Sequence, residues 1–210
     1  MSTDLRMDTV RYVFGCLVVI TLPPGVAWWF VIHPFADFWR RVGGRVTISI
    51  GMVLLVLSMV PLYWIRDTLL ISDLGPSRFM AAVGAVALVG AAGIAIKRKK
   101  YLTLRILIGL PELEEGGKGG TLLTEGPYSL SRNPRYLEMI LGVFGYAAFS
   151  NYVGAYIVAL ITVPAIHLIV IMEEAELRER FGAEYEDYLA RVPRYLPPWS
   201  SWLRRGPEKS

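Results

Sequence analysis

The sequence predicts an all-α, polytopic membrane protein, and two observations carry this prediction. Of its 210 residues, 54% are hydrophobic, a larger share than a soluble globular domain usually contains. These residues gather in runs long enough to cross a hydrocarbon core of about 30 Å, at about 1.5 Å of helix per residue. We expect about five transmembrane helices of this kind, at Tyr12–Ile32, Val46–Ile65, Phe79–Ile96, Leu137–Phe149 and Tyr152–Met172.

The first of these spans differs from a secretory signal peptide. A signal peptide has a basic start, a short apolar stretch and a cleavage site of small residues, whereas this span is long and ends in Trp28, Trp29 and Phe30. We therefore expect it to stay in the mature protein. Its Cys16 is the single cysteine of the chain, so an intramolecular disulfide is excluded.

The first three spans have the character of a membrane scaffold. The third is rich in alanine and glycine, which let helix backbones approach closely where no hydrophobic force drives association. It ends in the basic run Lys97–Lys100, which marks the anionic membrane surface and is also suited to a lipid headgroup.

The fourth and fifth spans predict a helical hairpin. Leu137–Phe149 has only about 20 Å of helix, and Ser150 and Asn151 interrupt the apolar pattern after it. We expect a short helix, a tight turn and a long returning helix, with a re-entrant pair as the alternative.

After Glu173 the sequence predicts a further helix outside the membrane. Apolar residues recur at three- and four-residue steps, at Leu177, Phe181, Tyr185, Tyr188 and Val192. This pattern indicates an amphipathic helix on the membrane surface or on the protein itself. Prolines 193, 197 and 198 should end it.

The distribution of charge predicts the orientation. Although the net charge is +4, the basic residues lie in loops beside apolar spans, which does not favour nucleic-acid binding. They concentrate after the first and third spans and in the tail, while the other side holds only Arg6, Arg11, Arg66 and Arg78. The positive-inside rule therefore places the N-terminus outside and the long third loop and tail in the cytoplasm, at the inner membrane of a bacterium or the endoplasmic reticulum of a eukaryote.

Candidate functional residues occur in two stretches, Thr121–Tyr136 and Glu173–Pro197. A charged group at the membrane boundary costs free energy unless it is paired with another charge or hydrated. Glu173 and Glu174 therefore indicate a functional site. His167 shares a helix face with Glu174. The sequence lacks HExxH, GxSxG and SxxK and any Cys/His metal spacing, so metal-dependent hydrolysis and serine acyl transfer are not supported.

In the first stretch, Asn133-Pro134 should start the fourth helix. A helix start offers backbone N–H groups and a positive dipole end to a carboxylate or phosphate. The aromatic faces of Tyr128 and Tyr136 are suited to stacking on a base or meeting a cation.

The block TLLTEGPYSLSRNPRYLEMIL, followed by a hairpin and then EEAELRERFGAEYEDYLARVPRYLP, resembles the isoprenylcysteine carboxyl methyltransferases and the related phospholipid methyltransferases. The resemblance covers about the last 90 residues. It implies S-adenosylmethionine as the methyl donor, a lipidic or prenylated acceptor, and a catalytic region at 101–210 on a three-span scaffold at 1–100, in one integrated domain. The implied donor-binding residues are Thr121, Leu122, Leu123, Tyr128, Asn133, Pro134, Arg135, Tyr136 and Glu173.

The acceptor determines whether a catalytic base is needed. A carboxylate acceptor needs none, whereas an amine must lose a proton, and the candidate bases are then His167, Glu138 and Glu174.

Three positions depart from the family pattern. Asn133 replaces a common histidine, Glu138 replaces a small residue, and Ile169 replaces an arginine thought to meet the substrate carboxylate of the eukaryotic enzymes. The last change argues against a prenylcysteine acceptor. Two other interpretations are a sterol-type reductase that uses NADPH and a non-enzymatic membrane interaction protein.

Overall fold

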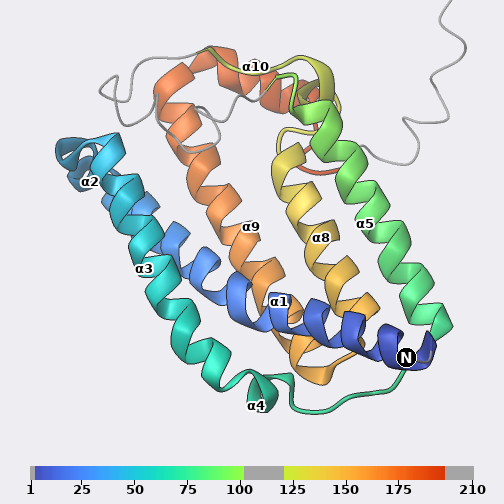
Figure 1. Ribbon diagram of the computed structural model, residues 1–210. Helices are drawn as coiled ribbons and strands as arrows, with labels where there is room; N and C mark the ends of the chain where they lie inside the picture. Colours follow the sequence, from blue (N-terminus) through green and yellow to red (C-terminus); the bar gives the residue numbers. More distant parts are fainter. Residues whose placement is uncertain (1–2, 102–120, 197–210) are drawn as a thin grey trace, which may run out of the picture.

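The computed structural model describes residues 3–101 and 121–196. Its regular structure within these ranges is helical, as the sequence predicts (Figure 1). The elements are α1 (Thr3–Ile32), η1 (His33–Phe35), α2 (Ala36–Val42), α3 (Gly44–Trp64), α4 (Arg66–Leu70), α5 (Arg78–Arg98), η2 (Gly126–Ser129), α8 (Pro134–Ser150), α9 (Val153–Phe181) and α10 (Ala183–Arg191).

Within the described ranges, four helices are long and apolar enough to cross a membrane. They are Arg6–Ile32 of α1, together with α3, α5 and α9. The fourth predicted span corresponds to α8, which has 17 residues and is the shortest of the five long helices. The prediction of a polytopic helical membrane protein is confirmed. Of the five predicted spans, α8 alone is not among the four candidate membrane spans in the described residues.

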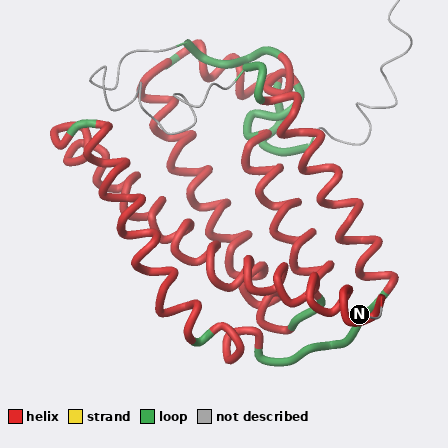
Figure 2. Tube along the Cα trace, viewed as in Figure 1, coloured by secondary structure: helices red, strands yellow, loops and turns green. Residues whose placement is uncertain are grey.

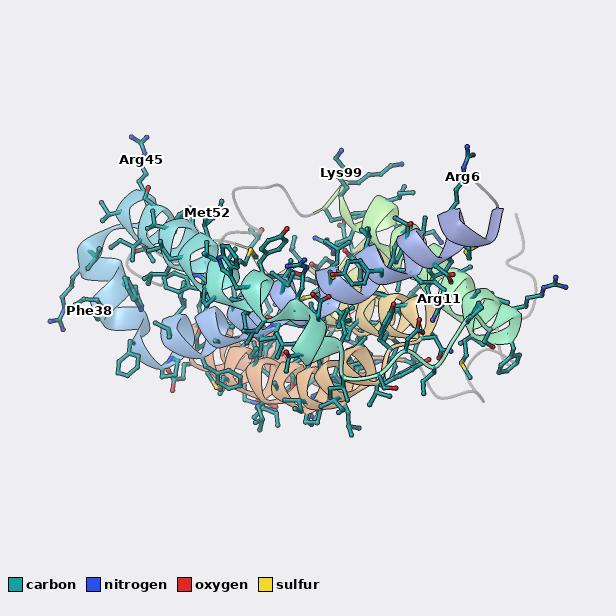
Figure 3. The ribbon with its side chains drawn as sticks, turned by 60° about the horizontal axis from the view of Figure 1, so that its bottom comes forward. Arg6, Arg11, Phe38, Arg45, Met52 and Lys99 are labelled. Atoms are coloured by element: carbon teal, nitrogen blue, oxygen red, sulfur yellow. The ribbon has the colours of Figure 1, made fainter. Side chains whose placement is uncertain are left out.

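Helix α1 crosses α8 and α9 at a steep angle, whereas α3, α5, α8 and α9 run more nearly alongside one another (Figures 1 and 2). It packs against both helices of the hairpin and against α3. The N-terminus, α4 and the α8–α9 turn lie at one end of the bundle, and α2 and α10 lie at the other (Figure 1). Figure 3 shows Arg6 and Arg45 projecting outward near opposite ends of α1.

Small residues allow α5 and α8 to approach closely, as the composition of the third span predicts. A Cβ atom added to Gly84 would lie 2.7 Å from the Gly145 carbonyl oxygen and 2.7 Å from the Phe149 amide nitrogen. A Cβ atom on Gly145 would lie 2.7 Å from Leu88 Cγ. Both glycines are buried, so the contact depends on their lack of a side chain.

The predicted turn between α8 and α9 is present at Asn151. This residue adopts the left-handed conformation, with φ 57° and ψ 42°, and its amide N–H donates to the Ala147 carbonyl at 2.9 Å. Its side chain donates to the Gly75 carbonyl at 2.8 Å. The buried Arg11 of α1 donates to the Ser150 carbonyl at 3.1 Å. Contacts from two other segments therefore hold the hairpin tip.

The prediction of one continuous helix after Glu173 is wrong. Helix α9 ends at Phe181, and α10 starts after Gly182, whose φ of 51° and ψ of −124° lie outside the helical region. Glycine has no Cβ and tolerates this conformation. The apolar face predicted for the segment is nevertheless present, because Tyr185 and Tyr188 are buried. They pack with Leu122 on the protein itself. Prolines 197 and 198 lie outside the described residues.

Candidate methyl-donor site

Backbone hydrogen bonds join the loop before α8 to the tail after α10. The Arg132 amide donates to the Pro193 carbonyl at 2.9 Å, and the Asn133 amide donates to the Arg194 carbonyl at 3.2 Å. The Ser131 hydroxyl also donates to the Arg194 carbonyl, at 3.2 Å. The two stretches singled out in the sequence are therefore in direct contact at the α10 end of the bundle.

Glu174 lies at the centre of this junction and is 1% exposed. Its carboxylate accepts hydrogen bonds from Arg194 Nη2 at 2.8 Å, Asn133 Nδ2 at 2.8 Å and Arg132 Nε at 3.3 Å. The hydrogen bond that Arg194 donates to Glu174 raises the pKa of the Arg194 guanidinium, so this cation stays charged. The geometry makes Glu174 an anchor of the loop and tail.

This anchor also explains an unusual helix start. Asn133 is the N-cap of α8, and Pro134 is its first residue, as predicted. The Asn133 side chain makes no capping hydrogen bond, because its amide donates to Glu174 and to the Arg194 carbonyl.

Tyr136 and Glu173 form a second contact between α8 and α9. Tyr136 is 2% exposed, and its hydroxyl donates to the Glu173 carboxylate. Ile166, Ile169 and Val170 of α9 pack against the same tyrosine. Ile169, where the eukaryotic enzymes have an arginine, is thus part of this apolar cluster and is 1% exposed.

An aromatic residue from the predicted scaffold completes the surroundings of Tyr136. The ring of Trp29, from α1, meets the Tyr136 ring edge-on, with centroids 6.4 Å apart. The Arg135 guanidinium lies 4.4 Å from the Trp29 centroid and 5.5 Å from the Tyr136 centroid. Sequence reasoning treated Trp29 as the end of a span, and its position in the sequence gave no sign of this contact.

Glu138 forms an ion pair with Arg98 at the end of α5. Arg98 Nε lies 2.9 Å from Glu138 Oε2, and Arg98 Nη2 lies 3.2 Å from Oε1. Both side chains are largely buried, at 11% and 21% exposure. Arg98 belongs to the basic run that was assigned to the membrane surface, so this partner was also missed.

The charges of Arg98, Arg135, Glu138 and Glu173 all influence the hydroxyl of Tyr128. Burial raises the pKa of its hydroxyl, and the charges of Arg98 and Arg135 oppose that increase. Its backbone carbonyl accepts a hydrogen bond from the Tyr188 hydroxyl at 2.6 Å. Helix α10 thus supports η2, which carries Tyr128.

His167 lies on α9 with a separate partner. Its Nδ1 atom is 2.9 Å from the Tyr195 hydroxyl, and the two rings are 5.9 Å apart. The three candidate bases, Glu138, His167 and Glu174, therefore have three different sets of partners.

The remaining predicted donor-binding residues lie around the same loop. Leu122 packs on the α10 cluster, Leu123 is half-buried, and Thr121 is exposed.

Comparison with known proteins gives two curated relatives. The cobalt-zinc-cadmium resistance protein CzcN of Cupriavidus metallidurans is 33% identical over 91 residues, which are 43% of this chain and 41% of the relative. The nickel-cobalt-cadmium resistance protein NccN of Alcaligenes xylosoxydans xylosoxydans is 30% identical over 82 residues, 39% of this chain and 38% of the relative. The match thus spans about two fifths of each relative.

No solved structure matches the chain significantly. The model of the phospholipid methyltransferase family matches residues 110–184. That range contains Tyr128, Asn133, Tyr136, Glu173 and Glu174. The match confirms the resemblance seen in the sequence and supports a membrane methyltransferase: residues 110–184 of this chain are similar to the phospholipid methyltransferase family.

Proposed function

We propose that this chain is an integral membrane methyltransferase that uses S-adenosylmethionine and acts on a lipidic or prenylated acceptor. The observation that carries the proposal is the Tyr136–Glu173 contact inside the family segment, with Arg135 and Trp29 beside it. The same contact joins the first turn of α8 to α9 at the end of the bundle that holds the tail.

The residues around Tyr136 fit the charges of the donor. S-adenosylmethionine carries an ammonium, a sulfonium and a carboxylate, and it supplies a methyl group on the sulfonium. Carboxylates and aromatic faces attract cations, and Glu173, Tyr136 and Trp29 provide both. Arg135, in the first turn of α8, is a partner for the donor carboxylate. Leu122 and Leu123 offer an apolar edge to the adenine.

In this proposal the protein acts mainly by alignment. Holding two reactants in a productive geometry lowers the barrier by several kcal/mol, of the order of 7 or more in the best cases. Glu174 is then a positioning residue, because its hydrogen bonds to Arg132, Asn133 and Arg194 fix the loop that carries Tyr128.

A base is required only for an amine acceptor. Glu138 and His167 remain the candidates, and each would have to exchange its present partner. The proposed orientation keeps the site and the tail in the cytoplasm, where the basic residues concentrate.

The names of the two relatives refer to resistance to metal ions. Among the described residues, no group of three or more His, Cys, Asp or Glu side chains is placed to hold a metal ion. If this chain contributes to metal resistance, the proposed activity implies a route through methylation of a membrane component.

The proposal is tested by calorimetric titration of the detergent-purified protein with S-adenosylmethionine, S-adenosylhomocysteine and NADPH. We expect both S-adenosyl compounds to bind and NADPH not to bind. Tyr136→Ala and Glu173→Ala should abolish binding while the protein still inserts and purifies, and Glu179→Gln on the exposed part of α9 is the matched control.

Binding of NADPH alone would favour a reductase. No binding of any of the three would favour an interaction protein. Full donor binding in both alanine variants would mean that these residues do not form the donor site. If the donor binds as expected, transfer of a radiolabelled methyl group to membrane extracts would identify the acceptor.

A further inference from the structure

A groove of about 300 Å³ runs along α1 at the end of the bundle opposite the candidate donor site. Its apolar wall includes Val13, Leu17 and Ile20, and its polar end includes Tyr12, Tyr63 and Arg66. Tyr12 and Trp29 are 17 positions apart on one helix, which separates them by about 25 Å. The groove is therefore not part of the donor site.

The polar end presents both signs of charge. Arg66 Nε donates to the Tyr12 hydroxyl at 2.9 Å, and that hydroxyl donates to Asp67 Oδ1 at 2.6 Å. Arg66 Nη2 is 3.8 Å from Asp67 Oδ2, and the Asp67 side chain is 68% exposed. The Arg66 guanidinium, which lines the groove, and the exposed Asp67 carboxylate, which adjoins it, thus lie side by side.

These charges lie where lipid headgroups are expected. Arg66 and Asp67 come directly after α3, one of the four candidate membrane spans. The preceding Tyr63 and Trp64 are 54% and 78% exposed. Exposed tyrosine and tryptophan at a helix end are typical of the membrane–water interface.

We infer that this groove binds a zwitterionic phospholipid, with the lipid phosphate on Arg66, its ammonium on Asp67 and part of an acyl chain along Val13, Leu17 and Ile20. The pairing of charges favours this class over an anionic lipid. An anionic headgroup would also place its phosphate on Arg66, close to the Asp67 carboxylate. It would bring no cation to pair with that carboxylate. A zwitterionic headgroup supplies both partners.

Native mass spectrometry of the detergent-purified protein tests the inference. The probes are phosphatidylethanolamine and phosphatidylglycerol with identical acyl chains, added in equal amounts. We expect one retained phosphatidylethanolamine per protein and a preference over phosphatidylglycerol of about tenfold, equivalent to about 1.4 kcal/mol.

Three variants separate the contributions. Asp67→Asn, at an exposed position, should remove the preference without preventing lipid retention. Arg66→Met should lower retention of both lipids, and Thr21→Phe should do the same by filling the groove, which Thr21 also lines. Arg78→Met, an exposed arginine at the same end of the bundle, is the control and should behave as the unmodified protein.

Equal retention of the two lipids by the unmodified protein would overturn the inference. So would an unchanged preference in Asp67→Asn, or unchanged retention in Thr21→Phe. Helicity by circular dichroism shows that each variant is folded, and titration with S-adenosylmethionine should be unchanged in Asp67→Asn. The two proposals can thus fail separately.

Discussion

Arg194 and Glu174 are 20 positions apart in the chain, and their side chains meet at 2.8 Å. The contact ties the tail to α9, and Arg132 and Asn133 bring the loop before α8 to the same carboxylate. Three segments of the proposed donor site, α9, the loop before α8 and the tail, thus meet at one buried anion.

Glu174→Gln should weaken the docking of the tail. Removing the charge leaves two guanidinium groups without their anion, and breaking a buried pair costs about 3 kcal/mol or more. Thermal unfolding should show the loss, and limited proteolysis should cut the tail faster. Arg178→Ala is the control, because its pair with Glu186 is 46% and 62% exposed and should be worth less than about 1 kcal/mol. Equal effects of the two variants would contradict the anchor role.

The docking of α10 should loosen at alkaline pH. Burial, followed by the charge of Glu174, raises the pKa of Tyr185 from 10.0 to about 12. Its protonated form therefore stabilises the fold, fully below about pH 10. This contribution decreases as the pH rises toward the folded-state pKa of about 12. Unfolding temperatures measured between pH 9 and 12 should fall less steeply in Tyr185→Phe. Parallel curves for the two proteins would contradict the prediction.

The Arg98–Glu138 pair should couple α5 to α8. Glu138→Gln and Arg98→Met, singly and together, form a double-mutant cycle, and we expect a coupling free energy of about 1 kcal/mol. If Glu138 serves only this contact, methyl transfer in the double variant should recover relative to Glu138→Gln. Continued loss of transfer with intact donor binding would instead favour Glu138 as the base.

Gly84→Ala should destabilise the packing of α5 on α8. The added methyl group would lie 2.7 Å from backbone atoms of α8, and such overpacking costs about 1–3 kcal/mol. Gly90→Ala is the matched control on the same helix, because its Cβ would make an ordinary 3.6 Å contact with Leu141 Cδ1. Thermal unfolding in detergent measures both, and a similar loss in the control would show that the effect is not specific to the close approach.

Trp29→Leu should weaken donor binding, because it removes the aromatic face beside Arg135 and Tyr136. A cation–π contact is worth about 0.5–2 kcal/mol, so calorimetry should show an affinity lowered by about two- to thirtyfold. Trp64→Leu, at the 78% exposed end of α3, is the control. Unchanged affinity in Trp29→Leu would exclude α1 from the donor site.

The sequence predicted the helices well because a membrane span needs a long apolar run, which is a local property. The turn at Asn151 was also local, since Ser150 and Asn151 interrupt that run. The break at Gly182 was missed because the apolar spacing continues across it, from Leu177 and Phe181 to Tyr185.

The adjacent glutamates show why the site was harder to predict. Neighbouring residues on a helix point about 100° apart. Glu173 therefore meets Tyr136, whereas Glu174 meets the loop and the tail. The sequence placed both at one site, with Glu173 as a donor-binding residue and Glu174 as a candidate base, but it did not indicate that Glu174 holds the loop and the tail. Trp29, Arg98 and Arg194 were missed for the opposite reason, because their partners are distant in the chain and no local pattern links them.

The contact between Asn133 and Arg194 has a consequence for biosynthesis. Asn133 donates to the Arg194 carbonyl, 61 positions further along the chain. During translation the loop before α8 therefore emerges well before the segment that holds it. The hairpin of α8 and α9 can enter the membrane while that loop is still unanchored. A ribosome that stopped before Arg194 would release an inserted protein whose loop before α8 lacks its anchor, so translation of the tail is the step that completes the proposed donor site.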